Sequence, residues 1–273
     1  MEILFMGTAA AEGIPALFCQ CDVCREAEKK GGKEIRTRAS CLIDNALLVD
    51  FGPDIFMHKL KYNLDLAEIE HTIITHSHAD HFTPIEMSYR HKMFATINND
   101  KILNVYGNAH VSNEFNKIYG HRESYKNQLK FNDIKSFETF NAGGYEITPL
   151  KALHKRDEEC FVYHIKKDGK AILYGNDSGI FPQETLDWLT GKELDLVIYD
   201  CTCALKKDGN NHMGLEDDVI LDNELRKRGC ITDKTKRVIT HFSHNGGATH
   251  ERLLQEGEKH GFIVAFDGMK LEV

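Results

Sequence analysis

One short segment limits the folds open to this chain more than any other. Residues 75–82 read THSHADHF and follow a short apolar run, so His76, His78, Asp80 and His81 form an H-x-H-x-D-H pattern after a predicted strand. Side chains two apart in a strand point the same way, and a following turn brings the next two toward a neighbouring point. Imidazole and carboxylate groups are ligands for zinc, manganese or iron. The pattern favours a metal site at a strand end over a polar surface loop.

Further donors for a second metal ion lie later in the chain. The four residues of H-x-H-x-D-H cannot saturate two ions, which would also need an anionic bridge. His154, Asp177 and His241 each come just past a strand-like run. Singly, each could be structural, and Asp177 could cap a turn. As a set that completes H-x-H-x-D-H, they indicate a two-metal centre.

The order of expected elements bears on the fold. No repeat, low-complexity tract or Pro/Ser-rich linker divides the chain, so we expect a single domain over residues 1–273. Hairpin-like strand pairs in the first half and strand–helix alternation in the second favour an α/β (α+β) fold, a four-layer αββα sandwich, over a doubly wound parallel sheet. The expected strands cover 2–7, 40–51, 71–76, 102–107, 161–165, 170–177, 194–200, 237–242 and 262–268, and the expected helices cover 53–62, 182–190, 214–229 and 248–260.

The charge balance bears on location and partners. The formal net charge of −8 offers no broad basic face, which disfavours nucleic acid. A small anionic substrate would need local neutralisation, for example by metal ions. The N-terminal sequence lacks a basic leader region, and no apolar run approaches the ~20 residues that span a bilayer. We therefore expect a cytoplasmic protein without membrane contacts.

A second cluster of ligand-type residues lies near the N-terminus. The hexapeptide CQCDVC contains Cys19, Cys21 and Cys24, and clustered thiols in a reducing compartment bind metal or do redox work. A redox pair does not need Cys19, and an iron–sulfur cluster usually needs four thiolates. A tetrahedral Cys3His zinc site accounts better for three thiols. The candidates for the fourth ligand are His244, Cys201 and Cys203.

The ordered donor set resembles the metallo-β-lactamase fold, in which H-x-H-x-D-H is followed by a lone His, a bridging Asp and a last His. Nearly the whole chain also resembles, within that fold, the phosphoribosyl 1,2-cyclic phosphate phosphodiesterase family of the carbon–phosphorus lyase pathway. The segments that carry this second resemblance are GTAAAEGIPALFCQCDVC at 7–24, DCT at 200–202, NHMGLED at 211–217, ITHFSH at 239–244 and FDGMKLEV at 266–273.

The resemblance implies a dinuclear-metal hydrolase with two active-site ions, manganese or zinc. The two ions would share a hydroxide that attacks a small anionic phosphodiester, a cyclic ribose phosphate. Asp80 and Asp177 would then belong to the catalytic residues. The resemblance also implies that His244 completes a structural zinc site with the three thiols, and it allows a homodimer. The implied ligands are His76, His78 and His154 for one ion, Asp80, His81 and His241 for the other, and Asp177 as the bridge.

A loop histidine is the candidate general acid. His212 lies in GNNHMG, bounded by glycine and asparagine. Hydrolysis must protonate a leaving alkoxide, and the matching family histidine has this role, which suits a group with a pKa near neutral. A solvated loop histidine is the alternative.

Several other residues carry weaker expectations. Arg36 and Arg38 could contact phosphate, but a solvated surface pair is the stronger expectation. Asp50 and Asp200 follow apolar runs, where we expect them to support metal-binding histidines. The segment 83–130 departs most from the family and is expected to shape the pocket.

Three rival functions remain open. A tRNA 3′-processing nuclease uses the same donors on the same fold, but it should show a basic arm or exosite, and none is visible. A pyrroloquinoline-quinone-biosynthesis protein has a similar N-terminus, but its donor set is altered, whereas all seven positions are filled here. A non-catalytic metal-binding protein would keep the fold without needing His212.

Overall fold

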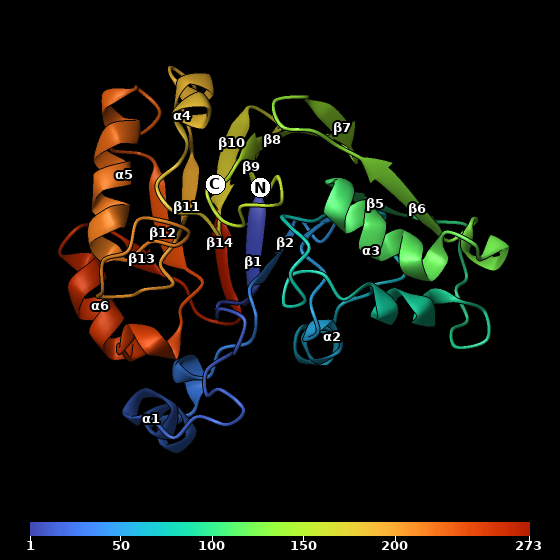
Figure 1. Ribbon diagram of the computed structural model, residues 1–273, viewed down its shortest axis with the longest axis horizontal. Helices are drawn as coiled ribbons and strands as arrows, with labels where there is room; N and C mark the ends of the chain where they lie inside the picture. The colour runs from blue at the N-terminus through green and yellow to red at the C-terminus, as the bar shows by residue number, and fades with distance from the viewer.

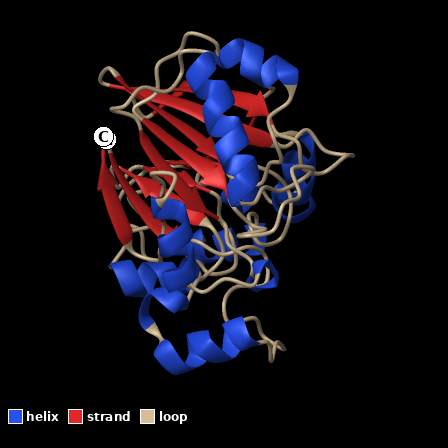
Figure 2. Cartoon of the chain, turned by 90° about the vertical axis from the view of Figure 1, so that its left-hand side faces the viewer, coloured by secondary structure: helices blue, strands red, loops and turns tan.

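The computed structural model describes residues 1–273 as two seven-stranded sheets packed face to face, with helices on both outer sides (Figure 1, Figure 2). The expected αββα sandwich is confirmed.

The first sheet has the strand order β14-β1-β2-β3-β4-β5-β6, and the second has the order β13-β12-β11-β10-β9-β8-β7. The strands are β1 (Glu2–Gly7), β2 (Ser40–Ile43), β3 (Leu47–Val49), β4 (His71–Ile73), β5 (Leu103–Gly107), β6 (Leu129–Asp133), β7 (Phe140–Ala142), β8 (Tyr145–Lys151), β9 (Phe161–Lys167), β10 (Lys170–Gly175), β11 (Leu196–Asp200), β12 (Lys236–Thr240), β13 (Ile263–Val264) and β14 (Met269–Glu272). The α-helices are α1 (Asp22–Lys30), α2 (Ile55–Tyr62), α3 (Ala109–Tyr119), α4 (Gln183–Leu189), α5 (Leu215–Lys227) and α6 (His250–Glu258), and the short 3-10 helices are η1 (Gly32–Glu34), η2 (Pro84–Arg90), η3 (Glu123–Tyr125) and η4 (His244–Gly246).

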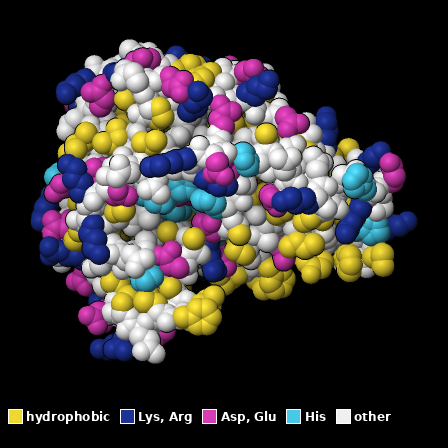
Figure 3. All heavy atoms as spheres, in the orientation of Figure 1, with side chains coloured by type: hydrophobic (Ala, Val, Ile, Leu, Met, Phe, Trp, Pro, Cys, Tyr) yellow, Lys and Arg dark blue, Asp and Glu magenta, His cyan; other side chains and the backbone are white.

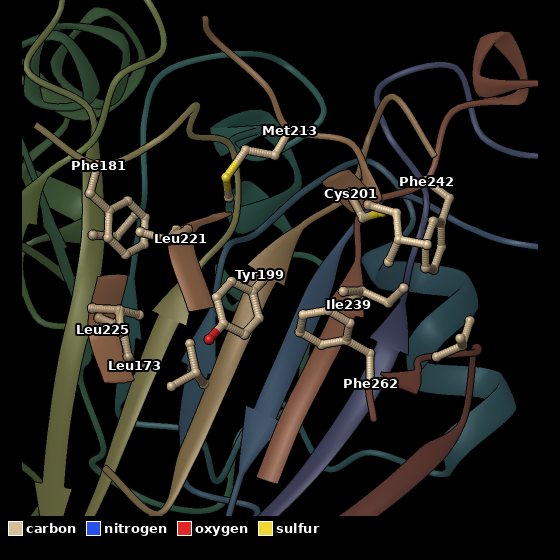
Figure 4. Close-up of a cluster of buried hydrophobic side chains, with 14 of the residues drawn as sticks. Leu173, Phe181, Tyr199, Cys201, Met213, Leu221, Leu225, Ile239, Phe242 and Phe262 are labelled. Carbon is tan, nitrogen blue, oxygen red and sulfur yellow. The ribbon is translucent and has the colours of Figure 1, made fainter. Parts of the chain in front are cut away.

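The alternation of side chains along the strands produces three apolar layers. In β1, Ile3 belongs to the central cluster between the sheets, and Leu4 belongs to the cluster under the helices of the first sheet. In β11, Ile198 belongs to the central cluster and Tyr199 to the outer cluster of the second sheet, to which α4, α5 and α6 contribute side chains. Figure 4 shows Tyr199 in this outer cluster together with Leu221 and Leu225 of α5. Because successive side chains of a strand point to opposite faces, each sheet is buried on both sides.

Strand direction decides where the functional side chains gather. Strands β3 to β6 run parallel to one another, as do β10 to β13. Strand β8 is antiparallel to β9, and β9 is antiparallel to β10, so β8 ends at the same edge as β10. The carboxyl ends of parallel strands share one edge of a sheet, where sites usually lie. The segments after β4, β8, β10, β11 and β12 can therefore meet.

The expected elements recur with shifted ends, while several others were not predicted. The run 262–268 forms only the two-residue strand β13. Helices α1 and α3 and strands β6, β7 and β14 are additional, whereas the strand-like run before His154 forms β8. In α3 the buried residues Val111, Phe115 and Tyr119 recur every four positions, a stripe that could have predicted the helix. No helix in the protein combines the length and the apolarity needed to cross a bilayer.

Candidate metal centre

All seven predicted donors lie at this shared edge, in the segments that follow β4, β8, β10 and β12. They form two groups, and within each group the potential ligand atoms lie within 4.8 Å of one another. The three-histidine group contains His76, His78 and His154, and the mixed group contains Asp80, His81, Asp177 and His241.

The three-histidine group presents ring nitrogens to one point. His76 Nε2 lies 2.9 Å from His78 Nδ1, and His154 Nε2 lies 3.2 Å from the same atom. Burial lowers the pKa of His76 well below its ordinary value, and nearby His81 lowers it further. The His76 ring therefore favours the neutral form, which is the form that binds metal.

The mixed group combines rings with carboxylates. His81 Nε2 lies 2.6 Å from Asp177 Oδ2 and 3.1 Å from Asp80 Oδ2, and His241 Nε2 lies 3.0 Å from Asp177 Oδ2. Burial alone would lower the pKa of His81, but Asp177, Asp50 and Asp80 raise it well above its ordinary value. The negative charge of these carboxylates, which would keep a proton on the buried His81 ring, also attracts a divalent cation.

Asp177 joins the two groups. Its Oδ2 faces His81 and His241, while its Oδ1 lies 4.0 Å from His154 Nε2. Despite the short distances, Oδ2 is a buried atom without a well-directed hydrogen bond. Buried acceptors rarely stay unpaired, and ring nitrogens converging on such an oxygen are the donor set of a metal site. The residues present therefore fit divalent metal ions.

Two buried carboxylates orient the rings from behind. Asp50 Oδ2 lies 2.7 Å from His81 Nδ1. His241 Nδ1 lies 2.8 Å from Thr202 Oγ1, which itself donates to Asp200 Oδ2 at 2.9 Å, while Asp200 Oδ2 is 3.5 Å from the ring nitrogen. Thr75 N also donates to Asp50, at 2.8 Å. These contacts agree with the supporting role expected for both aspartates. With one ring nitrogen facing a carboxylate, the other is directed toward the donor group.

The backbone at the site is strained at three strand ends. Asp50, Asp177 and His241 have positive φ values of 64°, 50° and 64°. Such a left-handed conformation costs a non-glycine residue on the order of 1 kcal/mol or more, and it persists only where the surroundings impose it. The packed strand ends impose it here, next to the donor groups.

His212 lies beside the mixed group, in the loop between β11 and α5. Its Nδ1 is 3.1 Å from Thr202 Oγ1, 3.2 Å from Asp200 Oδ2 and 3.4 Å from Asp177 Oδ1. Burial would lower its pKa, but the hydrogen bond to Asp200 raises it to about 9, above the expected near-neutral value. Its side chain is 21% exposed, so the alternative of a solvated loop histidine is wrong.

A cavity of about 600 Å³ opens over both donor groups. Histidine side chains gather near the middle of this face of the molecule (Figure 3). The other lining residues come from 10–12, 202–208, 211 and 243–246. None lies in 83–130, so the expectation that this segment shapes the pocket is wrong. That segment contributes β5 and α3 to the first sheet and its outer layer, whereas the loops after β11 and β12 lie at the shared edge.

Several polar residues of the cavity were not singled out from the sequence, and three of them lie just before His212. Lys206, Lys207 and Asn211 line it, all in the loop after β11 that also carries His212. Lys206 and Lys207 are the two cationic side chains of the lining. The run KKDGNN directly before His212 was the available signal, because a basic pair beside a candidate catalytic residue suits an anionic substrate.

The thiol cluster forms around the predicted histidine. The Sγ atoms of Cys19 and Cys21 lie 3.4 and 3.5 Å from His244 Nδ1, and Cys24 completes a group within 4.8 Å. Burial would raise the pKa of Cys21, but hydrogen bonds from the Cys24 backbone and from the side chains of Cys19 and His244 lower it to about 7. A thiolate is the form that binds zinc. The other two candidates for the fourth ligand, Cys201 and Cys203, are outside this group.

Arg36 and Arg38 were expected to be a solvated surface pair, and this expectation is wrong for Arg36. Arg36 is buried and donates hydrogen bonds to Thr8 Oγ1 and the Ala265 carbonyl, both at 2.7 Å. Arg38 instead pairs with Asp54 at 3.1 Å. Neither lines the cavity. The buried Arg36 side chain therefore stabilises the fold, because it links the segments that carry Thr8 and Ala265.

The sandwich and the histidine–aspartate donors at its edge define the class of the protein as the metallo-β-lactamase fold, whose members include metal-dependent hydrolases. A family model described as a beta-lactamase superfamily domain matches residues 45–242. The chain therefore belongs to the beta-lactamase superfamily.

Solved structures share the fold along the whole chain. A diphosphatase from the PhnP family has a TM-score of 0.77 and 21% identity, covering 100% of this chain and 97% of that one. Zinc-bound PqqB from Methylobacterium extorquens has a TM-score of 0.70 and 19% identity, covering 100% of both chains. The short form of human tRNase Z has a TM-score of 0.64 and 18% identity, covering 100% of this chain and 99% of that one.

One relative found by sequence is described as a transferase and matches only part of the chain. An octanoyltransferase from Porphyromonas gingivalis is 26% identical over an alignment of 166 residues, which covers 57% of this chain. The match spans only 31% of the length of that protein.

Proposed function

We propose that the protein is a metal-dependent phosphodiesterase that hydrolyses a small anionic diester, with a cyclic ribose phosphate as the leading substrate. The observation that carries this proposal is the placement of Asp177 between the two donor groups. In the proposal, each donor group would hold one divalent ion, manganese or zinc, with Asp177 available to both groups.

The chemistry follows from the donor arrangement. Divalent ions at these groups would lower the pKa of a coordinated water and offset charge on the phosphoryl oxygens. Asp50 holds His81, and Thr202, which donates to Asp200, holds His241 in the orientation that such ions require. His212 is the general acid of the proposal. Since its Nδ1 faces Asp200 and Thr202, Nε2 is the atom left to protonate the leaving alkoxide.

The cavity supports a small substrate. Its volume of about 600 Å³ falls within the range of ordinary small-molecule sites. Lys206 and Lys207 at its lining would offset the carboxylates of Glu12 and Asp208, which line it as well. Metal ions at the donor groups would supply the further positive charge that an anion needs in a chain whose net charge is −8. The same net charge disfavours a long nucleic acid, which needs a basic surface along its backbone.

The thiol cluster has a separate place in the proposal. Cys19, Cys21, Cys24 and His244 would hold one structural zinc ion, with the convergence of their ligand atoms as the supporting observation. Such a zinc ion would fasten the N-terminal loop to the segment that carries His241, without taking part in hydrolysis.

A substrate panel on protein reconstituted with Mn²⁺ or Zn²⁺ tests the function. The panel contains ribose cyclic phosphates, 2′,3′-cyclic nucleotides, bis(p-nitrophenyl) phosphate, RNA including tRNA precursors, lactones and thioesters, with Asp177→Ala as the inactive control. We expect the highest kcat/KM on a cyclic ribose phosphate. Preferred cleavage of tRNA precursors would indicate a tRNA 3′-processing nuclease instead. Inactivity on every substrate with every metal would favour a non-catalytic metal-binding protein or one related to pyrroloquinoline quinone biosynthesis.

A further inference from the structure

A buried carboxylate outside the donor groups connects the segments that carry the three-histidine group. The Glu158 side chain is fully buried, four residues beyond His154. Its Oε1 accepts hydrogen bonds from Ser77 N at 2.8 Å and Asn108 Nδ2 at 2.9 Å. Its Oε2 accepts from Ser77 Oγ at 2.6 Å and Lys155 Nζ at 3.1 Å. Four donors therefore converge on one carboxylate.

These partners come from three separate parts of the fold. Ser77 lies between His76 and His78 in the segment after β4, and Asn108 follows β5 and caps helix α3 with its side chain. Glu158 lies in the segment after β8, which belongs to the second sheet. A single side chain thus links the edges of both sheets next to the donor groups.

The charge of Glu158 matters to these contacts. Burial alone would raise its pKa, but the hydrogen bonds from Ser77, Asn108 and Lys155 lower it. The side chain is therefore ionised, and hydrogen bonds to an ionised acceptor are about twice as strong as neutral ones. A glutamine of the same shape would turn an NH2 group toward two of the four donors and leave them unpaired.

We propose that Glu158 is a positioning residue for the three-histidine group. By holding the Ser77 peptide, it fixes His76 and His78 relative to the segment that carries His154, and it thereby sets the affinity of that group for metal. This inference rests on the proposed function, because it requires a metal ion at the three histidines. A purely structural contact would affect the stability of the fold alone.

The test compares Glu158→Gln with Glu159→Gln, which alters the neighbouring exposed carboxylate, whose side chain bonds to Ser136. Metal-free chains are titrated with Zn²⁺ against a chelator and with Co²⁺ by absorption, where the thiolate charge-transfer band separates the thiol cluster from the histidines. We expect Glu158→Gln to weaken metal binding at the three-histidine group by about 10- to 100-fold. Its Co²⁺ d–d spectrum should change as well, and Glu159→Gln should match the wild type in both.

A double variant identifies the route of the effect. Ser77→Ala should give a smaller loss than Glu158→Gln, and the two together should lose less than the sum of the single losses, because they remove the same contact. Wild-type metal affinity and Co²⁺ spectrum in Glu158→Gln would overturn the positioning role, even if its unfolding midpoint fell. A wild-type chain that binds no metal at the histidines would overturn the proposed function together with this inference.

A different observation points to an interaction surface. Large apolar side chains gather along the lower edge of the molecule, over α2 and η2 and at the loop before α1 (Figure 3). Phe18 is 97% exposed and Met93 is 78% exposed. The exposed rings of Tyr89 and Phe94 pack edge to face, with their centroids 5.5 Å apart. The lower apolar face is defined here by Phe18, Phe56, Leu60, Tyr89, Met93 and Phe94.

The size of the lower apolar face bears on its occupant. With about 150–250 Å² per aromatic side chain, its six residues expose on the order of 700 Å². That exceeds the ~300–600 Å² of the largest patch on a typical monomer and approaches the ~800 Å² that each partner contributes to a stable complex. The net charge of −8 opposes docking on an anionic membrane. We infer that a second copy of this chain covers the face in a two-fold symmetric contact, in which the same patch serves both copies.

Sedimentation equilibrium of the zinc-loaded wild type tests this surface. We expect a dimer at micromolar concentration and a monomer for Phe56→Ser/Met93→Ser, while Leu205→Ser, which changes an exposed residue outside the face, stays dimeric. Because the changed side chains are exposed, the circular dichroism of the double variant should equal that of the wild type. A monomeric wild type at about 50 μM would overturn the inference. Binding of that monomer to phosphatidylcholine vesicles would assign the face to a lipid surface instead.

Discussion

The histidine–aspartate centre and the thiol cluster both present metal-binding side chains, yet they are built in opposite ways. The donors of the first follow strands of both sheets, and buried carboxylates such as Asp50 and Asp200 hold their rings. The thiol cluster joins Cys19 and Cys21 of an irregular segment, and the buried Cys24 in the first turn of α1, to His244 at the start of η4, with Cys19 and His244 partly exposed. The family match at 45–242 contains every donor of the first and none of the second. A packed sheet edge can hold donor geometry before any ion binds, whereas a cluster on loops depends more on the metal itself.

The two sites are nevertheless connected. His241 and His244 lie three residues apart after β12. Glu12 lines the active-site cavity, accepts a hydrogen bond from Ser243 Oγ, and has its Oε1 3.7 Å from His244 Nε2. The comparison therefore predicts large catalytic losses from changes at the first site, and mainly stability losses from changes at the second.

Asp177→Ala should have the largest effect. Loss of a supporting residue around a metal site costs about 10–100-fold, so removal of a carboxylate that faces both donor groups should cost kcat/KM more than about 10³-fold. Metal analysis should show loss of metal from the histidine–aspartate centre while the thiol cluster keeps its zinc. Activity within tenfold of the wild type would show that the two donor groups do not act as one centre.

His212→Ala should have the next largest effect. Loss of a general acid should lower kcat by about 10²-fold on diesters with alkoxide leaving groups and by less than about threefold on bis(p-nitrophenyl) phosphate, whose leaving group needs little protonation. The measurement is kcat on both substrates, with metal content determined in parallel. Because His212 is outside both donor groups of the proposal, metal loss in this variant would contradict its assignment.

His244→Ala should act mainly on stability. Loss of the fourth ligand should release the structural zinc and lower the free energy of unfolding by about 2 kcal/mol. We expect kcat/KM to fall by less than about tenfold, because the donors of the active centre follow strand ends that do not depend on this zinc. Denaturant unfolding with zinc analysis measures the effect, and His260→Ala, which changes an exposed histidine, is the matched control. Retention of the full zinc complement would count against His244 as the ligand.

Glu12→Gln should have the smallest effect. Its contact with His244 is long and partly exposed, and such ion pairs contribute about 0–1 kcal/mol. Zinc affinity of the thiol cluster should therefore fall by no more than about threefold, with a similarly small change in kcat/KM. Competition titration of zinc measures the first quantity. A catalytic loss as large as that of His212→Ala would mean that the two sites are coupled far more strongly than their construction indicates.

Local sequence pattern determined much of the centre. The apolar run at 71–75 located His76 and His78 beyond the carboxyl end of a strand, although β4 ends at Ile73 and strand alternation does not extend to the two histidines. The positions of His154 and Asp177 just after apolar runs anticipated their place at the shared sheet edge. These features are readable because they depend on strand periodicity and on the few residues that follow each strand.

Only the tertiary structure decided which distant residues complete the site. Glu158 contacts Ser77 across 81 positions, and Arg36 donates to His250 Nδ1 at 2.8 Å across 214 positions. The same holds for the cavity lining, which comes from the loops after β11 and β12 and not from 83–130. The sequence alone determined the αββα class, the seven donors and the three thiols, because strand periodicity and ligand chemistry are local. Burial, hydrogen-bond partners and pocket walls were decided by packing, because they depend on which segments the two sheets bring together.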